Sequence, residues 1–385
     1  MKIAQFIDIF FPHVDGVVNA VDNYARIMNE AAGDYCCVFA PDNAKGAPER
    51  EGGYDVFRAK SVRFIGGYLW PVPSLSKTVK EAAQTHTFDI VHAHSPFMMG
   101  HFARRFAKKH GVPLVCTFHS KYYDDFLRVT HSRFLARQCT NYIIRLYNKA
   151  DEVWAVNEGT ADTLREYGYK GRITVMPNGG DMDFSGREDE LRARAGKRFG
   201  IEENDKTLLF VGNQIWHKNI KLILDTLLLL KPEGYRLISV GDGYDLADIK
   251  KYAEKTGVAD IVSFEGKVTD RELLAGLYAS GDLLFFPSAY DNAPLVVLEA
   301  AAMGTPAMLL EGSNSAGAVK DGINGFICPG DASGCAEAIK RAFADRARLK
   351  SIGEEAKRSV YRSWRDAVSP ARAEYERIIE EYKKK

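Results

Sequence analysis

The sequence has few cysteines and lacks the features of a secreted chain. Its six cysteines, spread over 385 residues, do not show the paired spacing of a metal-binding motif. The first residues lack the long apolar core of a signal peptide. These absences predict a protein of the reducing cytoplasm.

An excess of charge of either sign is also absent. Lysine and arginine number 52 and aspartate and glutamate 51, so the net charge of +1 gives no reason to expect a nucleic-acid partner. With 46% hydrophobic and 27% charged residues, the composition is neither that of a disordered chain nor that of a membrane-spanning one. No low-complexity segment or short repeat interrupts the chain, and its length accommodates two domains with separate cores.

The first half of the chain alternates apolar strands with helices. A strand over 2–9 leads into a glycine-containing loop over 10–17 and a helix, the arrangement with which doubly wound folds approach phosphate. Two later strands end in His94 and His119. Because the carboxyl ends of parallel strands lie at one edge of a sheet, we expect these polar ends to meet there.

The alternation restarts after a turn-rich crossover at 177–180. The sequence therefore predicts an α/β protein with two Rossmann-like domains that face each other across a cleft. The first domain is expected to span 1–176 and the second 177–363. The closing helix, 364–385, is expected to pack back on the first.

The stretch 285–306 reads as a buried strand, a loop and a helix over 294–303. Asn292 can cap this helix, whose first amides are then free to bind an anion. Asp291 and Glu299 add two carboxylates, which accept hydrogen bonds from hydroxyl groups. Such a set suits a polyhydroxylated phosphate ester, although an ordinary strand-loop-helix with Glu299 satisfied locally has the same pattern.

His119 is a candidate for a direct role in chemistry. A polar and aromatic loop, 121–125, follows it at the edge where doubly wound sheets bind ligands. A histidine at a strand end is commonly a hydrogen-bonded structural residue, and this alternative stays open for both His94 and His119.

Short motifs extend over nearly the whole chain in a fixed order. They are Gly16-Val17, His94-Ser95-Pro96, Thr117-Phe118-His119-Ser120, Met176-Pro177-Asn178-Gly179, Val211-Gly212, Lys218-Asn219, Val240-Gly241-Asp242-Gly243, Phe286-Pro287-Ser288, Leu298-Glu299-Ala300 and Asp321-Gly322-Ile323-Asn324-Gly325-Phe326. With these motifs the chain resembles the retaining glycosyltransferases of family 4, also called group 1, which have the GT-B fold. Such enzymes transfer a sugar from a nucleotide diphosphate donor, usually without a metal.

The resemblance implies a division of roles within the donor site. Glu299 would bind the ribose hydroxyls, Asp291 the hydroxyls of the donor sugar, and Lys218 the diphosphate. The family usually has Glu at position 291 and an arginine at the position of Asn213, so one acid is shorter and one cation is missing. The implied donor-binding residues are Gly16, Val17, Asn213, Lys218, Asp291, Asn292, Ala293, Pro294, Leu295, Val296 and Glu299. The implied catalytic residues are His119, Lys218 and Asp291.

The resemblance also implies front-face transfer. Bond breaking builds negative charge on the diphosphate, which Lys218 and backbone amides would stabilise, and no covalent nucleophile, cofactor or metal is expected. Asp181-Met182-Asp183 has an acid-x-acid spacing that binds metal in another glycosyltransferase fold, but its place in the crossover favours a turn. Because His119 and Lys218 fall in different domains, the cleft is expected to close on the donor.

The substrates are less closely defined by the resemblance. The donor is expected to be a uridine diphosphate hexose, with a guanosine diphosphate sugar left open, and the acceptor to carry a lipid or saccharide hydroxyl. Asn213 and Asp291 both depart from the family at donor contacts. They keep open a nucleotide-sugar-binding protein with weak or no transfer activity, and a GT-B sugar-nucleotide epimerase is a further alternative.

One segment is strongly basic. Between Gly100 and Ala150 ten lysines and arginines stand against two acids, and Arg133, Arg137 and Arg145 recur at multiples of four on an expected helix. This pattern predicts peripheral contact with the anionic inner face of the cell membrane and a lipid acceptor such as diacylglycerol. A solvated helix whose arginines pair with acids elsewhere in the fold is the alternative.

Overall fold

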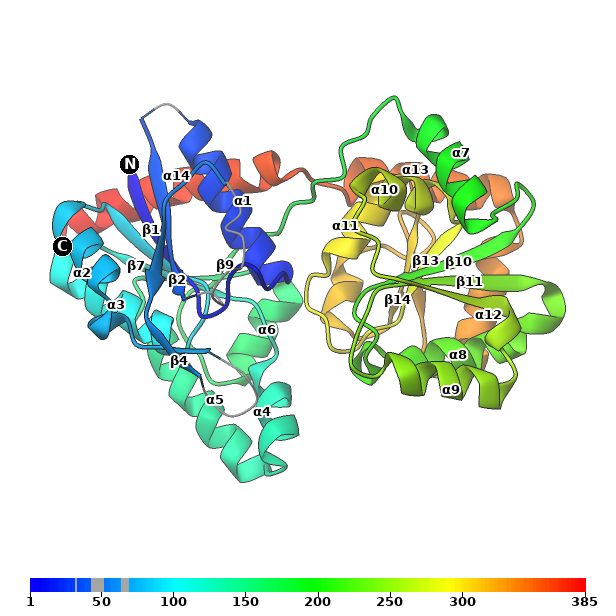
Figure 1. Ribbon diagram of the computed structural model, residues 1–385, viewed down its shortest axis with the longest axis horizontal. Coiled ribbons are helices and arrows are strands. Elements are labelled where there is room, and N and C mark those ends of the chain that lie inside the picture. Colours follow the sequence, from blue (N-terminus) through cyan, green and yellow to red (C-terminus); the bar gives the residue numbers. More distant parts are fainter. Residues whose placement is uncertain (32, 43–51, 64–68) are drawn as a thin grey trace. The chain divides into compact units, whose positions relative to one another are not determined.

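The computed structural model describes residues 1–31, 33–42, 52–63 and 69–385. They form two compact units, Met1–Asn178 with Trp364–Lys385, and Gly179–Ser363. Each unit has a parallel sheet with helices on both faces and a hydrophobic cluster of its own (Figure 1). The chain therefore consists of two Rossmann-like domains, which confirms the expected α/β class.

In the described part of the first unit, seven parallel strands form a sheet in the order β3-β2-β1-β6-β7-β8-β9. The strands are β1 Lys2–Phe6, β2 Tyr35–Pro41, β3 Val56–Ala59, β6 Ile90–Ala93, β7 Leu114–Phe118, β8 Glu152–Ala155 and β9 Thr174–Val175, and β4 Ser61–Arg63 pairs separately with β5 Leu69–Pro71. The helices are α1 Gly16–Glu30, α2 Lys77–Thr85, α3 Met98–His110, α4 Tyr122–Thr130, α5 Arg133–Tyr147 and α6 Glu158–Glu166.

The closing helix α14, Trp364–Lys383, belongs to the first unit and packs beside α1 (Figure 1). The Tyr375 ring is fully buried and stacks on Trp154 of β8, with 5.0 Å between the ring centroids. Arg372 donates a hydrogen bond of 2.8 Å to Asp34, the residue that precedes β2. Apolar stacking and charged contacts together fix the last helix against a sheet formed by the start of the chain.

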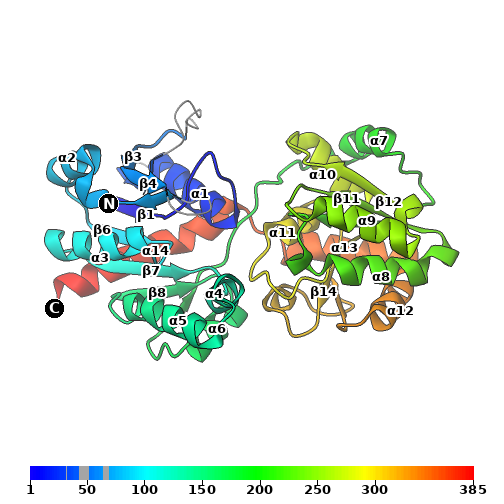
Figure 2. The same cartoon turned by 60° about the horizontal axis from the view of Figure 1, so that its bottom comes forward.

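In the second unit six parallel strands form a sheet in the order β12-β11-β10-β13-β14-β15. The strands are β10 Lys206–Val211, β11 Tyr235–Val240, β12 Val262–Gly266, β13 Leu283–Phe286, β14 Ala307–Leu310 and β15 Phe326–Cys328. Helices α8 Ile220–Leu230, α9 Leu246–Thr256 and α12 Ala332–Phe343 cover one face, and α7 Glu188–Phe199, α10 Arg271–Ser280, α11 Leu295–Ala302 and α13 Arg346–Ser359 the other (Figures 1 and 2).

Both sheets contain a switch point, where successive strands begin to be added on the opposite side. It lies between β1 and β6 in the first unit and between β10 and β13 in the second. The loops that follow two such strands diverge and leave space at the carboxyl edge of the sheet. These two edges are where the fold places a ligand.

The loop expected at 121–125 is the first turn of helix α4 instead, so that prediction is wrong. Tyr122 and Phe126 are one turn apart and both pack against Phe97, with ring centroids 5.5 Å and 6.2 Å from it. Asp124 and Asp125 lie in the first turn, where carboxylates are favourable to the helix dipole. Apolar packing of one face therefore makes a helix of a segment whose composition is polar and aromatic.

Candidate functional site

The switch point of the second unit brings Lys218 and Asp291 together. Lys218 follows β10 and Asp291 follows β13, and the Lys218 ammonium forms an ion pair with Oδ1 of Asp291. The other oxygen of Asp291 accepts a hydrogen bond from the Ser288 hydroxyl at 2.6 Å. Both charged side chains are largely enclosed, with 13% and 16% of their surface exposed. An anionic ligand with several oxygens could replace the Asp291 carboxylate as the partner of the Lys218 ammonium.

The loop that carries Lys218 is held from both sides. Asn219 adopts a left-handed conformation, with φ of 62°, and its side-chain amide donates to the Pro287 carbonyl at 3.1 Å. On the other side Gly241 lies against the loop, because a Cβ at that position would be 1.9 Å from the Gly212 carbonyl oxygen. Gln214 is buried beneath the loop and accepts from the Ser239 hydroxyl at 3.2 Å. Lys218 therefore projects from a fixed backbone.

Asn213 is exposed on the same loop. Its neutral side chain supplies no charge to the edge where Lys218 lies, so the structure offers a single cation from the β10 loop. The start of α11 also faces this edge, since it follows Asp291 directly.

Helix α11 begins without a side-chain cap. Its N-cap residue is Pro294, and the expected capping by Asn292 is wrong, because the side-chain oxygen Oδ1 of Asn292 accepts from the side-chain amide of Asn314 at 2.7 Å. Within the described residues the amides of Leu295 and Val296 have no hydrogen-bond acceptor. Two free amides at the positive end of a helix favour an anion. They lie four and five positions after Asp291.

Glu299 is buried one turn into α11. Its Oε1 accepts hydrogen bonds from both terminal nitrogens of Arg271, each at 3.1 Å, and its Oε2 accepts from the Tyr278 hydroxyl at 2.9 Å. Burial raises the pKa of Glu299, and the Arg271 charge and the Tyr278 hydrogen bond partly offset that rise. The carboxylate is thus a rigidly held acceptor rather than a freely rotating acid.

Sequence reasoning missed Arg271 and Tyr278. They are seven positions apart on α10, which puts them two turns apart on one side of the helix. That spacing was readable in the sequence, but the identity of their partner was not, because α10 and α11 are brought together by packing on the same sheet face.

The acid-x-acid pattern in the crossover makes local contacts. Asp181 forms an ion pair with Arg271, and Asp183 accepts from the Ser185 hydroxyl at 2.9 Å. In the part of the chain that the structure describes, no group of three or more histidine, cysteine or acidic side chains could hold a metal ion. The independence of the chain from metals remains a prediction.

In the first unit the strand ends form a cluster of neutral imidazoles. His94 and His119 are joined by a hydrogen bond of 3.2 Å between Nδ1 and Nε2. Behind them the His92 ring contacts the Tyr375 hydroxyl and lies 2.7 Å from the Thr117 hydroxyl. Burial lowers the pKa of His119 to about 4 and also lowers those of His94 and His92, so His119 is uncharged at neutral pH. It can therefore bind hydroxyl groups but does not neutralise a phosphate.

Gly16 and Val17 open helix α1, after β1 and beside the first switch point. Asp15 caps the helix through a hydrogen bond from the Val18 amide at 2.8 Å. A Cβ built on Gly16 would meet nothing within 4 Å, so there is open space next to its backbone. The site residues thus fall into two sets, one in each unit.

The basic helix carries unpaired charges. Arg133, Arg137, Arg145 and Lys149 are exposed on and after α5, and none forms an ion pair with another described residue. On the same helix Phe134 is 69% exposed, and Leu135 and Tyr142 are each 48% exposed. A face that combines free cations with exposed apolar side chains differs from an ordinary solvated helix face.

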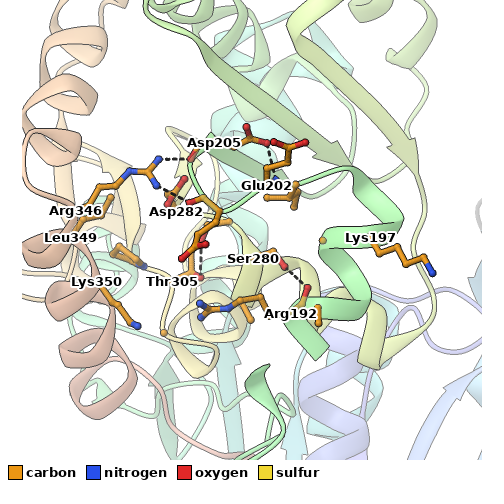
Figure 3. A pocket seen from close by; sticks show the side chains of 18 residues that line it. Arg192, Lys197, Glu202, Asp205, Ser280, Asp282, Thr305, Arg346, Leu349 and Lys350 are labelled. Atoms are coloured by element: carbon orange, nitrogen blue, oxygen red, sulfur yellow. Dashed lines mark hydrogen bonds between the residues drawn. The ribbon is translucent and has the colours of Figure 1, made fainter. Parts of the chain in front are cut away.

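A separate cavity of about 530 Å³ lies in the second unit, at the opposite edge of its sheet (Figure 3). It is lined where strands begin, by Asp205 before β10, Asp282 before β13 and Thr305 before β14. Arg346 donates to the backbone carbonyls of Glu203 at 3.0 Å and of Asn204 at 3.1 Å, so its charge is used to hold a turn. None of the predicted site residues lines this cavity.

Two family descriptions match the chain, one over each half. "Glycosyltransferase Family 4" matches residues 14–184, and "Glycosyl transferases group 1" matches residues 192–359. Among curated proteins, alpha-monoglucosyldiacylglycerol synthase of Streptococcus pneumoniae is 26% identical over 318 residues, which are 80% of this chain and 70% of that one. Sulfoquinovosyl transferase of Arabidopsis thaliana is 28% identical over 97% of this chain and 73% of its own.

Solved structures of other proteins have the same fold as this chain. Sucrose-phosphate synthase from Thermosynechococcus elongatus superimposes with a TM-score of 0.82 over 98% of both chains, at 19% sequence identity. At that identity the likeness concerns the fold alone.

Proposed function

The chain belongs to the glycosyltransferases of family 4, and from this premise we propose that it is a retaining hexosyltransferase with a nucleotide diphosphate sugar as donor. The observation that carries the proposal is the meeting of Lys218, Asp291 and the free amides of α11 at one switch point. A cation and two amides suit a diphosphate, and the adjacent carboxylates of Asp291 and Glu299 suit hydroxyl groups.

Donor binding exchanges the partners of Lys218. A diphosphate oxygen replaces Asp291 at the ammonium group, and the released carboxylate accepts from a hydroxyl of the donor sugar. Because the Lys218 side chain is already enclosed, its attraction to the phosphate is little screened by water. Ser288 holds the second oxygen of Asp291 and keeps the acid near the sugar during this exchange.

The transfer step needs stabilisation of the leaving group above all. The bond between the anomeric carbon and the diphosphate oxygen breaks with its electron pair on the phosphate, and the acceptor oxygen bonds to the same face of the carbon. The acceptor proton passes to the departing phosphate oxygen. Lys218 and the α11 amides stabilise the negative charge that develops there. Neutral His119 contributes a hydrogen bond to the sugar rather than a charge.

Donor identity is tested by thermal shift. We propose a uridine diphosphate hexose and keep a guanosine diphosphate sugar as the second choice. A bound donor raises the melting temperature by an amount that grows with its affinity, so the uridine compounds should give the larger shift. If uridine, guanosine and adenosine diphosphate hexoses all leave the melting temperature nearly unchanged, the proposal is contradicted.

An assay for the glycoside product distinguishes sugar transfer from donor binding alone. With the stabilising donor and an acceptor, the enzyme should release nucleotide diphosphate and form a glycoside with retained anomeric configuration, in chelator as well as without it. Asn213 and Asp291 favour the second candidate, a nucleotide-sugar-binding protein with weak activity, because both depart from the family pattern at donor contacts. Donor binding without glycoside formation would support that candidate.

For the acceptor, we propose a lipid hydroxyl at an anionic membrane surface. The pneumococcal relative is an alpha-monoglucosyldiacylglycerol synthase, and the free cations and exposed apolar side chains of α5 fit the interface of an anionic membrane. Among the described helices none is long and apolar enough to cross a bilayer. Contact through α5 would therefore be peripheral.

Liposome sedimentation tests this contact. Vesicles with anionic lipid should bind the chain at low salt, and the triple variant Arg133→Gln, Arg137→Gln, Arg145→Gln should lose most of that binding, since each basic residue near the surface contributes about 1 kcal/mol. The matched control changes three exposed lysines of the second unit, Lys250→Gln, Lys255→Gln and Lys267→Gln, and removes the same charge. An equal loss in both variants would leave a saccharide acceptor as the better proposal.

A further inference from the structure

The most tightly held group of the donor site is Glu299, and its partners come from a different helix. We propose that Arg271 and Tyr278 of α10 are positioning residues, which hold the Glu299 carboxylate ionised and oriented toward the donor ribose. This inference rests on the proposed function, in which Glu299 meets the nucleotide. Neither residue needs to touch the donor itself.

The geometry leaves one direction open for a ligand. A carboxylate offers about four acceptor positions, two on each oxygen. The two terminal nitrogens of Arg271 donate hydrogen bonds to Oε1 and fill both of its acceptor positions, and the Tyr278 hydroxyl fills one of the two positions on Oε2. The position that remains is on Oε2, so this oxygen is the acceptor for a ribose hydroxyl. Without Arg271 the carboxylate could turn, and Oε1 would compete.

Because Glu299 is buried, it needs the Arg271 charge nearby to stay ionised. Burial raises the pKa of Glu299, and only 10% of its side chain is exposed. The groups that face it are Arg271 and Tyr278 from α10 and the Asp181 carboxylate from the crossover, which acts against ionisation. Arg271 is the one cation of this set. Its loss would raise the pKa of Glu299 further, so a larger share of the acid would be protonated near neutral pH.

The packing of α10 provides a matched control. Arg194 of α7 also makes ion pairs with α10, to Asp270 at 2.6 Å and to Glu272 at 3.2 Å, but it does not contact Glu299. Arg194→Met therefore removes an arginine that joins α10 to its surroundings without touching the carboxylate. Arg271→Met removes the proposed positioning contact, and Arg271→Lys keeps the charge but gives up the two-nitrogen geometry.

The experiment measures the affinity of each variant for uridine diphosphate and guanosine diphosphate by calorimetry. For whichever nucleotide the unaltered chain binds, Arg271→Met should weaken binding about tenfold or more at neutral pH, and Arg271→Lys less. Arg194→Met should change it by no more than about twofold. The ratio of the Arg271→Met to the Arg194→Met dissociation constant should fall as pH rises from about 6 to about 9, because the acid ionises again.

A nucleotide without ribose hydroxyls separates positioning from general support of the fold. The 2′,3′-dideoxy form of the same diphosphate cannot donate to Glu299, so Arg271→Met should bind it about as well as the unaltered chain does. Equal losses for the ribose and dideoxyribose forms, or no loss for either, would overturn the inference. If Arg271→Met does not fold, Arg271→Lys and Tyr278→Phe decide by the same pair of ligands. Failure of the unaltered chain to bind any nucleotide would instead overturn the proposed function.

Discussion

The two switch points of this protein have the same backbone arrangement and opposite electrostatic character. In the first unit the strand-end imidazoles of His94 and His119 are neutral because burial lowers the pKa of each. In the second the strand-end loops and helices hold Lys218, Asp291, Glu299 and Arg271 as ion pairs. The comparison shows that one fold can place uncharged imidazoles at the carboxyl edge of one sheet and ion pairs at that of the other.

Burial explains the difference. A buried imidazole without a charged partner can lose its proton and avoid the cost of an enclosed charge, whereas an enclosed lysine and aspartate compensate each other for lost water by forming an ion pair. Each edge is therefore sensitive to a different kind of substitution.

Removing the cation of the second switch point should have the largest effect. Lys218→Met leaves the developing charge of the leaving diphosphate without its ammonium partner, and kcat/KM should fall about 1,000-fold, which corresponds to about 4 kcal/mol. Steady-state transfer kinetics give the value. Lys231→Met, which breaks a surface pair with Asp260 in the same unit, is the control and should leave kcat/KM nearly unchanged. A tenfold or smaller loss in Lys218→Met would mean that the α11 amides carry the charge alone.

The neutral edge should make the first unit acid-sensitive. Burial lowers the pKa of His119 from 6.5, its ordinary value, to about 4 in the folded state. As pH drops from about 6.5 to about 4, His119 is therefore protonated in the unfolded chain before it is protonated in the folded one, and the free energy of unfolding falls. The contribution of His119 is at most about 3 kcal/mol, and His92 and His94 act in the same direction. Asp8 opposes them, because burial raises its pKa to about 6 and protonation then favours the folded state.

The charged edge should respond in the opposite sense. Burial raises the pKa of Glu299 at this edge, and also that of Asp282 at the opposite edge of the same sheet, so falling pH stabilises the second unit at both positions. Urea unfolding at about pH 7 and about pH 5 measures the contrast. Trp216→Phe removes the single tryptophan of the described second unit, so the remaining fluorescence reports the first unit. Equal acid shifts for both units would contradict the assignment of neutral histidines to one edge.

The two edges should divide binding from turnover. Glu299→Ala should weaken nucleotide affinity about thirtyfold, because a charge-assisted hydrogen bond to the ribose is lost and Arg271 is left without its carboxylate. His119→Ala should lower kcat about tenfold and leave nucleotide affinity within about twofold, because the imidazole is proposed to meet the sugar. Calorimetry with nucleotide and kinetics with the full donor separate these outcomes. Similar losses of nucleotide affinity in both variants would refute the division.

The smallest expected effect is a gain. Asn213 is exposed on the loop of Lys218, at the position where the family resemblance implies an arginine. Asn213→Arg should raise kcat about threefold, since a second, solvent-screened cation adds little to an enclosed one. Asn213→Gln is the control for side-chain length. If Asn213→Arg and Asn213→Gln behave alike, the amides of α11 already supply what the missing cation would add.

Much of the fold was readable from local patterns. The alternation of apolar runs with helical segments predicted two Rossmann-like domains, and the structure confirms both sheets. Predictions failed where a contact distant in sequence replaced a local one. Asn292 does not cap α11, because Asn314 takes its oxygen, and 121–125 is helical, because Tyr122 and Phe126 find Phe97 to pack against.

Local patterns in the sequence were enough to predict the order of strands and helices, the family, and which loops follow the ends of strands, because these depend on the period of apolar residues and on turn residues close in the chain. The packing of the folded chain was needed to establish that Arg271 and Tyr278 hold Glu299, that Lys218 pairs with Asp291, and that His119 is neutral. Partner choice and protonation depend on distances and burial between segments far apart in sequence. These quantities exist only after the sheets have formed and the helices have packed on them.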